Sequence, residues 1–395
     1  MISGISSKER VLSTILHQPV DHLPICFNSI CHGGVAFIDQ LFPDPFKKAK
    51  YYMELGVDTG VNLNLAEFNQ HMGLTNFTSH ENISVKQWNE NVKGEECAIS
   101  IKEFETAKGK LRQSVRRRDE YPHSIIPLFS DFNVPPGRTY KYLIDKKEEL
   151  DVLSCILKAP NRNELNRFFE FAAVAKDFCD KNNILFTATT LGVADIMIWL
   201  SGVENILFAA ADEPEFLERY IQIVADWNMK VLEIYIDAGV DLVTRRGWYE
   251  CTDFWSPKMY KEFLFAPLKK EIEVAHQADV KFSYIMNSGA TALKDHFIDL
   301  GLDILTNIEP DKNNLVLMKK AIDKSIVLCT GVNNYNVIEL GTEAEVQKAV
   351  IEAIETLSPN GGFILAPSDS ILSTSEIAKR NFYKMVDTWK EYASV

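Results

Sequence analysis

Short apolar runs with a two-residue period alternate with longer amphipathic segments along most of the chain. The stretch from Lys281 to Gly289, KFSYIMNSG, predicts a short buried strand that leads into a polar turn and a helix, with Phe282, Tyr284 and Met286 on one side of the strand. Similar units recur from end to end, and helical patterns separate most of them. This repetition predicts a TIM (β/α)8 barrel, an α/β fold whose chemistry lies where the strands end.

The predicted strands are short, and most of them precede a predicted helix. The first helix begins with a capping box, Ser6-x-x-Glu9, and Pro214 divides the helical pattern of residues 203–238 into two helices. Strands are expected at residues 23–27, 59–65, 184–190, 241–245, 281–286, 303–308, 326–330 and 362–366.

Residues 66–158 interrupt this rhythm. Segments 85–88, 97–104 and 110–116 predict antiparallel strands with hairpin turns between them, and residues 146–157 predict a helix. We therefore expect a single barrel domain over residues 1–395, with an antiparallel β-containing insertion after the second strand that covers the barrel mouth.

The insertion contains the one basic run of the chain. The run favours the solvated face of a hairpin, and a docking patch for an acidic partner is the alternative. It comprises Lys108, Lys110, Arg112 and Arg116 to Arg118.

Composition narrows the classes of partner. The net charge of −13 and the pI near 5.2 argue against a nucleic-acid-binding surface. The seven cysteines are scattered without a CxxC pair, which suits a reducing cytoplasm better than a disulfide framework. The N-terminal residues MISGISSKERV contain no apolar signal core, and no apolar run approaches the roughly 18 residues of a membrane span. We expect a soluble, cytoplasmic protein with neither a nucleic-acid nor a membrane partner.

The predicted strand ends are rich in amides, hydroxyls and aromatic rings. In a barrel of this type the residues that bind substrate come from the ends of several strands and from the loops after them. The candidate substrate-binding residues are Asn28, His32, Asn64, Thr189, Arg246, Trp248, Tyr249, Met286, Asn287, Ser288 and Asn333.

Three residues are candidate catalytic acids. Glu250 follows Arg245 and Arg246, which together are able to clamp a carboxylate or phosphate; a salt-bridged rim is the equally weighted alternative. Tyr284, if it faces the barrel interior, is able to donate a proton, but a core tyrosine with a satisfied hydroxyl is the more common arrangement. Asp369 follows the last strand and either acts as an acid or caps the next turn.

Several segments resemble the uroporphyrinogen decarboxylase superfamily, which also contains cobalamin-dependent methyltransferases. The resemblance begins with SKERVLSTILHQPVDHLPI and continues with AGVDLVTRRGWYECTDFWSPKMYKEFLFAPLKKEI, which is similar to the fourth-strand region. It ends with DKSIVLCTGVN, ELGTEAEVQKAV and PNGGFILAPSDSI, which are similar to the last two strands. The similarity covers residues 5–60 and 184–392 and implies the barrel fold.

The loop after the first strand departs from the decarboxylase pattern. In the family's decarboxylases this loop is rich in arginine and holds the many carboxylates of the substrate. Here it is FNSICHGG, without arginine. Because burying unpaired carboxylates is costly, a porphyrinogen has little to bind there.

The zinc motif of the methyltransferase branch is also altered. That branch holds zinc with His-x-Cys after the fifth strand and with a cysteine after the last strand. The positions that match His-x-Cys here are Met286 and Ser288. The position that matches the family's last cysteine falls near Ser368 or Asp369. Methionine and serine are poor zinc ligands, so the thiol-activating site is absent or is rebuilt from other residues. The alternative ligands are His32, Glu250, Cys251 and Asp369.

The resemblance and its departures imply a substrate-side methyltransferase. Such an enzyme moves a methyl group from a small O-methyl compound, for example an aryl methyl ether, to the Co(I) corrinoid (cobalamin) of a partner protein. Two alternatives stay open: a decarboxylase of a smaller carboxylic acid, with Arg245 and Arg246 as the clamp, and a non-catalytic binding barrel. The expected partners are the methylated substrate and the corrinoid protein, and the sequence leaves bound zinc and a homodimer open.

Overall fold

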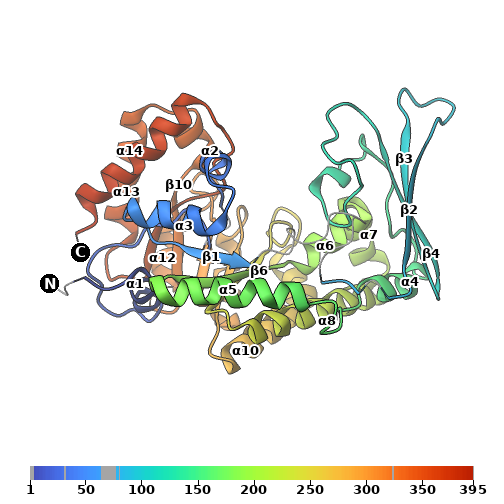
Figure 1. Cartoon of the computed structure of the whole chain (residues 1–395), viewed down its shortest axis with the longest axis horizontal. Helices are drawn as coiled ribbons and strands as arrows, with labels where there is room; N and C mark the ends of the chain where they lie inside the picture. Colours follow the sequence, from blue (N-terminus) through green and yellow to red (C-terminus); the bar gives the residue numbers. More distant parts are fainter. Residues whose placement is uncertain (1–3, 31–32, 64–76, 80, 323, 395) are drawn as a thin grey trace. The chain divides into compact units, whose positions relative to one another are not determined.

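The computed structural model describes residues 4–30, 33–63, 77–79, 81–322 and 324–394 (Figure 1). The chain divides into two compact units, and each has its own sheet. The first unit consists of Met1–Leu63, Phe171–Thr190 and Tyr235–Val395, and the second consists of Asn64–Glu170 and Leu191–Ile234.

The first unit is built on a curled, seven-stranded parallel sheet. Its strands follow one another in the order β1-β6-β7-β8-β9-β10-β11. Their bounds are β1 (Gly60–Leu63), β6 (Leu185–Leu191), β7 (Leu242–Arg246), β8 (Lys281–Ile285), β9 (Ile304–Thr306), β10 (Val327–Val332) and β11 (Phe363–Pro367). Seven of the eight predicted strands are therefore present as parallel strands with helices between most of them.

The remaining predicted strand, residues 23–27, is present only as two isolated bridges. Ile25 pairs in parallel with Leu365 of β11, and Cys26 pairs in parallel with Asp58, two residues before β1. The two edge strands of the sheet therefore meet this same segment from opposite sides.

The helices of the first unit begin and end largely where capping residues predict. The capping box at Ser6 and Glu9 is present at the start of α1, and Thr342 with Glu345 forms a second box at the start of α13. The α-helices are α1 (Ser7–Ile15), α2 (Ala36–Leu41), α3 (Pro45–Glu54), most of α5 (Asn166–Asn182), α9 (Pro257–Met259), α10 (Phe265–Gln277), α11 (Lys294–Leu300), α12 (Leu315–Ile322), α13 (Glu343–Leu357) and α14 (Glu376–Tyr392). Two π-helices, η2 (Tyr260–Leu264) and η4 (Asn334–Glu339), and a 3-10 turn, η3 (Thr291–Leu293), complete the set.

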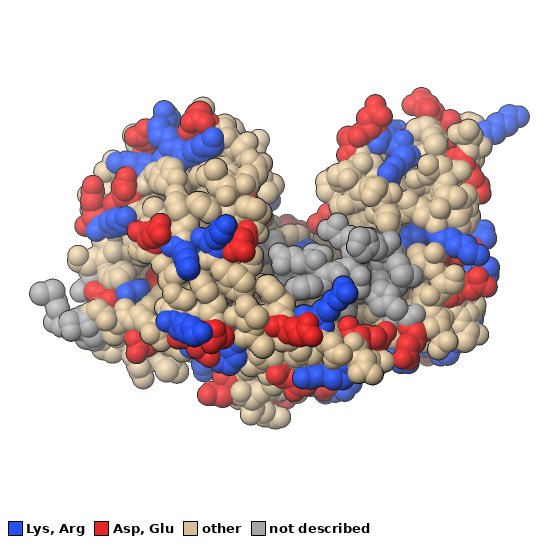
Figure 2. Space-filling view, viewed as in Figure 1, with Lys and Arg blue, Asp and Glu red and all other residues tan. Residues whose placement is uncertain are grey.

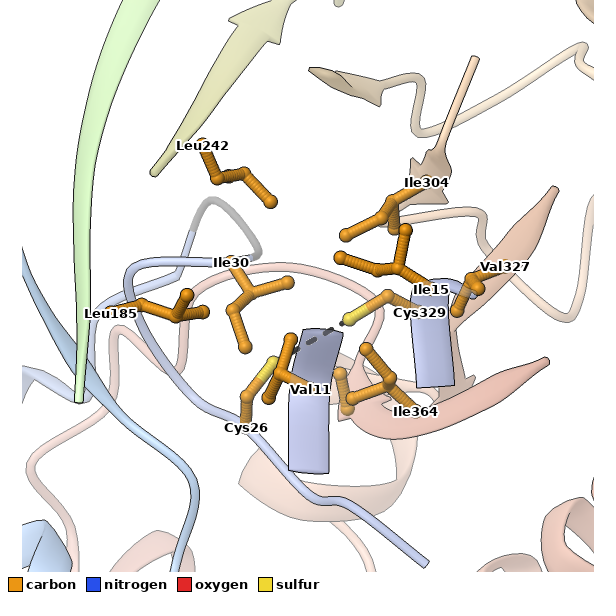
Figure 3. Close-up of a cluster of buried hydrophobic side chains, with 11 residues drawn as sticks. Val11, Ile15, Cys26, Ile30, Leu185, Leu242, Ile304, Val327, Cys329 and Ile364 are labelled. Carbon is orange, nitrogen blue, oxygen red and sulfur yellow. Dashed lines mark hydrogen bonds between the residues drawn. The ribbon is translucent and has the colours of Figure 1, made fainter. Parts of the chain in front are cut away.

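The inner face of the curled sheet surrounds a small apolar core. Figure 3 shows side chains from α1, β6, β7, β9, β10 and β11 pointing toward one another, with the sulfur atoms of Cys26 and Cys329 3.4 Å apart. Ile30, from the loop after the first bridge segment, lies in this core and is fully buried. Its carbonyl oxygen accepts hydrogen bonds from Thr244 of β7 and Ser283 of β8. These contacts identify the face of the sheet that carries Thr244 and Ser283 as the inner one.

The second unit contains a four-stranded antiparallel sheet in the order β2-β3-β4-β5. One face of this sheet is buried and carries Phe104, Leu111 and Val115 together with a buried lysine, Lys102. The strands are β2 (Ser84–Glu90), β3 (Ile99–Thr106), β4 (Gly109–Arg116) and β5 (Thr139–Lys141). The unit also contains α4 (Glu149–Ile156), α6 (Val193–Ser201), α7 (Val203–Asp212), the 3-10 turn η1 (Asp131–Asn133) and most of α8 (Pro214–Ala238).

The antiparallel strands predicted for the insertion are confirmed, as are the helix at α4 and the break at Pro214. The limits of the insertion at 66–158 and its place over the barrel mouth remain predictions. Among the described residues, no single helix is long and apolar enough to cross a membrane, although α6 and α7, bent by 109°, together meet that test of length and composition.

The basic run of the insertion is largely paired with acids. Glu103 contacts both Lys110 and Arg112, and Arg116 contacts Glu95. Basic and acidic side chains are also interspersed on the face drawn in Figure 2. The pairing favours the solvated, salt-bridged face over a docking patch.

Candidate functional site

A buried charge network joins the ends of β7 and β8 to helix α10. The guanidinium of Arg245 contacts Glu250 at 2.8 Å and Glu271 of α10 at 2.9 Å, and all three side chains are almost completely buried. The hydroxyl of Tyr284 donates a hydrogen bond to the other carboxylate oxygen of Glu250. Arg245 is therefore held by two carboxylates and is not free to clamp a substrate.

The combined effect of burial and neighbouring charge raises the pKa of both donors of this network, Arg245 and Tyr284. Burial lowers the pKa of Arg245, but the neighbouring carboxylates of Glu250 and Glu271 outweigh this effect and raise it above its ordinary value. Burial and the negative charge of Glu250 raise the pKa of Tyr284 well above that of a free phenol. The guanidinium stays charged and the phenol stays protonated.

The backbone around the network is shaped to admit the Tyr284 ring. A Cβ atom on Gly247, in the turn after β7, would lie 2.5 Å from that ring. Tyr260 opens the π-helix η2 and is also fully buried, and burial together with Glu250 raises the pKa of its phenol. π-Helical turns of this kind are frequent at functional sites.

The network lies on the outer face of the sheet. Thr244 and Ser283 pair across β7 and β8 and face the inner core, so the next pair along these strands, Arg245 and Tyr284, faces the opposite way. Tyr284 accordingly packs edge-on against Phe297 of α11. Tyr284 is thus a core tyrosine with a satisfied hydroxyl, the arrangement favoured from the sequence, and it does not face the barrel interior: both faces of β8 are buried, and the polar Ser283 is the residue that points inward.

A second polar cluster lies just after the ends of β8 and β11, and its residue Asn287 continues the inner face of β8. The Asn287 amide donates to the Asp369 carboxylate at 2.8 Å, and the other carboxylate oxygen accepts from the backbone of Ser370. The Asn287 side-chain oxygen is buried and has no hydrogen-bond partner within the described part of the chain. Burial raises the pKa of Asp369, although hydrogen bonds from Ser370 and Asn287 and the charge of Arg246 oppose the shift. This carboxyl group holds its proton to a higher pH than a free aspartic acid does.

Arg246 belongs with this inner group. It lies two residues after Thr244 and therefore on the same face of β7. Its guanidinium stacks over the Trp248 ring at 3.9 Å from the ring centre. The charge of Arg246 also acts on the Asp369 carboxyl group.

The loop after β8 is tied to the loop after β7. Ser288 donates to Asp253, and Thr252 donates to the carbonyl of Gly289 through both its hydroxyl and its backbone amide. Gly289 has a φ of +55°, and a Cβ atom there would meet Thr252 at 2.5 Å. The polar turn that follows β8 therefore has a fixed path.

The remaining predicted residues have separate surroundings. Asn333 donates to both Glu309 and Asp311 after β9, and Asn62 pairs with Thr189 across β1 and β6. Met286 is fully buried. The other positions are occupied as follows: the Asn28 oxygen accepts from Thr59, and the Tyr249 ring packs on Phe254. His32 and Asn64 lie outside the described residues.

Sequence reasoning missed Glu271 as the second partner of Arg245. A signal was present, because α10 buries Leu268, Ile272 and Ala275 on one stripe and Glu271 lies on that same stripe. A carboxylate in an apolar stripe predicts a buried cationic partner, since an unpaired buried charge is costly.

The side chains at the positions that match the family's zinc ligands are buried or bonded to other residues. Met286 is buried, the Ser288 hydroxyl bonds Asp253, and Asp369 bonds Asn287. In the described ranges, no group of three or more histidine, cysteine, aspartate or glutamate residues is placed to hold a metal ion.

The sequence matches the model of one known protein family. A family model for uroporphyrinogen decarboxylase (URO-D) matches residues 143–392, which is more than half of the sequence. No curated protein matches the sequence.

Solved structures that are similar to the chain have low sequence identity with it. A methyltransferase from Methanosarcina mazei superposes with a TM-score of 0.63 at 15% identity, covering 98% of this chain and 99% of that one. A B12-independent methionine synthase from Shewanella sp. W3-18-1 gives a TM-score of 0.46 at 11% identity, with 95% and 97% coverage. The family match, together with the sheet it spans, leads to one conclusion: the chain belongs to the uroporphyrinogen decarboxylase family.

Proposed function

We propose that this protein is the substrate-side methyltransferase of a corrinoid system. Its substrate is a small O-methyl compound, an aryl methyl ether in the simplest case, and the methyl group passes to a corrinoid on a separate protein. The proposal takes the fold to be a closed (β/α)8 barrel with the insertion at 66–158, and the compartment to be the cytoplasm.

One observation carries this proposal. At the strand ends where the family's methyltransferases hold zinc, this chain has Asn287, between the matching positions Met286 and Ser288, and an Asp369 carboxyl group whose pKa is raised by burial. A thiol substrate needs a metal to become a good nucleophile, whereas a methyl ether needs a proton for its departing oxygen. The residues present suit the second need.

The chemistry divides between the partner and this chain. The corrinoid supplies the nucleophile for the methyl carbon. As the carbon–oxygen bond breaks, the oxygen keeps the electron pair and receives the Asp369 proton, so that an alcohol or phenol leaves. Asn287 fixes the Asp369 carboxyl group through the 2.8 Å hydrogen bond. General acid catalysis of this kind contributes roughly 10²–10⁴-fold to the rate.

Aromatic and cationic groups orient the substrate in this proposal. The Trp248 ring and its stacked Arg246 offer a face for an aryl group, with Tyr249 next in the chain. Glu250 and Tyr284 are buried on the outer face, so we assign them to holding the turn after β7 rather than to direct proton transfer.

A decarboxylase of a smaller acid is the second candidate. The inner-face position of Arg246 supports it, because a single guanidinium is able to bind one carboxylate bidentately. Arg245 does not contribute to that clamp, since Glu250 and Glu271 hold it.

The test mixes the purified protein, a Co(I) corrinoid protein and a panel of methoxylated aromatics. If the protein transfers the methyl group, the Co(I) absorbance should disappear and a phenol should be released. The variant Asp369→Asn should show neither change. Release of carbon dioxide from small acids, abolished by Arg246→Ala, would support the decarboxylase instead. Binding of the corrinoid protein without turnover of any substrate would indicate a non-catalytic barrel.

A further inference from the structure

Strand β2 is the edge strand of the antiparallel sheet in the second unit. It pairs with β3 over its whole length, and no other strand within the described residues pairs with its outer edge. Its residues are exposed or only half-buried on both faces. Such an edge presents unpaired backbone donors and acceptors that are ready to bond another strand.

The charges on β2 differ from the other exposed charges of this sheet, which are paired. Lys86 lies opposite Glu103 of β3, but the Glu103 carboxylate is already held by Lys110 and Arg112 of the next strand. Neither Lys86 nor Glu90 forms an ion pair in the part of the chain that the structure describes. The sheet therefore has two exposed, opposite charges on β2 that its own residues do not neutralise.

The spacing of these charges is self-complementary. Lys86, Trp88 and Glu90 share one face of β2, and the Trp88 indole donates to the Glu90 carboxylate at 2.6 Å, which holds that carboxylate near the strand. In an antiparallel pair of two β2 strands with Trp88 opposite its own copy, Lys86 lies opposite Glu90 of the partner subunit. Two-fold symmetry repeats this contact, so both charges of both strands are paired.

The other registers do not give this match. Centring the pair on Lys86 places like charges opposite each other, and centring it on Gln87 or Asn89 places one of the charges opposite Trp88. A single lysine on an edge discourages pairing, whereas Lys86 and Glu90 flanking Trp88 favour one register with a second copy of the same strand.

We propose that the β2 edge is a homodimer contact, in which two chains join their antiparallel sheets through β2 in the register centred on Trp88. The partner is a second copy of this chain. This inference does not rest on the proposed methyl transfer.

Sedimentation velocity over a range of protein concentrations tests the contact. The unmodified chain is expected to dimerise, with a dissociation constant that rises with added salt because the paired charges are exposed. Lys86→Glu or Glu90→Lys alone should weaken the dimer about tenfold or more, since each turns two attractive pairs into repulsive ones. The double variant Lys86→Glu/Glu90→Lys should restore it.

The control breaks a comparable exposed pair elsewhere. Lys348→Glu changes the Lys348–Glu352 pair on α13 and should leave dimerisation unchanged. Circular dichroism of each variant separates loss of pairing from loss of folding. A chain that stays monomeric at high concentration, or single and double charge variants that dimerise equally, would overturn the proposal.

A cross-link tests the register itself. Residues directly opposite in an antiparallel pair have Cα atoms about 4.5–5.5 Å apart, within the range of a disulfide. Trp88→Cys should therefore give a covalent dimer when diamide oxidises the two thiols, and Ser84→Cys should not. Equal cross-linking of both variants would contradict the register.

Discussion

The buried network around Arg245 makes the strongest prediction about stability. One guanidinium lies between two carboxylates, at 2.8 Å from Glu250 and 2.9 Å from Glu271, with the three side chains 0–2% exposed. At an effective dielectric constant of about 20, each of these contacts is worth on the order of 5 kcal/mol of Coulomb attraction. Replacing the arginine by leucine removes both attractions and leaves two carboxylates buried without a cation.

The measured loss should be smaller than the sum of those attractions, because the orphaned carboxylates take up protons. Breaking a buried pair typically costs about 3–5 kcal/mol, and we expect Arg245→Leu to fall at the upper end of that range. Glu271→Gln keeps the contact with Glu250 and should cost less. Urea denaturation followed by circular dichroism at pH 7 gives the free energy of unfolding of each variant.

Arg112→Leu is the matched control for Arg245→Leu. The Arg112 side chain is 57% exposed and contacts Glu103 on the sheet surface. An exposed pair contributes only about 0–1 kcal/mol, so the control should unfold nearly as the unmodified protein does. If Arg245→Leu were also within about 1 kcal/mol of the unmodified protein, the network would not hold the ends of β7 and β8 together and the reasoning would be wrong.

Three further predictions concern single sites. Burial lowers the pKa of Lys102 from 10.5 to about 7, so the folded state gives up this proton more easily than the unfolded state; stability should rise from about pH 7 to pH 10, and Lys102→Met should remove that rise in urea denaturation. Burial raises the pKa of Asp369, so the methyl-transfer rate should be highest at low pH, where this carboxyl group is protonated, and should fall as the pH passes the raised pKa. A pH–rate profile of Asp369→Asn should lack this decline. Gly247→Ala places a methyl group 2.5 Å from the Tyr284 ring and should lower the melting temperature measured by calorimetry, whereas Gly56→Ala, which meets no atom within 4 Å, has only the strain of its positive φ to overcome.

The strands and their order of appearance could be predicted from hydrophobic period, but the inward face of each strand could not. In an all-parallel sheet both faces of a strand are covered, so apolar residues fill both and alternation loses its meaning. The alternating Phe282 and Tyr284 of β8 suggested an inward phenol, and the inward residue is Ser283. Only the partner of each side chain, which lies far away in the sequence, distinguishes the two faces.

Loop paths were equally hidden from the sequence. The turn after the first bridge segment enters the inner core through Ile30, with Ser29 at a φ of +67°. A positive φ is uncommon outside glycine, and neither Ser29 nor Ile30 is a residue type that predicts this path of the loop. From the sequence, Asn287 and Asp369 were both expected after predicted barrel strands. The hydrogen bond between them was not predicted, because the two residues are distant in the chain.

The measurement that tests the account most directly compares methyl-transfer rates of the unmodified protein and Asp369→Asn across aryl methyl ethers whose phenols differ in acidity. If Asp369 protonates the departing oxygen, the variant should lose the most rate, up to roughly 10²–10⁴-fold, with the least acidic phenols, and the loss should shrink as the phenol becomes a better leaving group. An equal loss for every ether, or none, would contradict the assignment of Asp369 as the acid of this site.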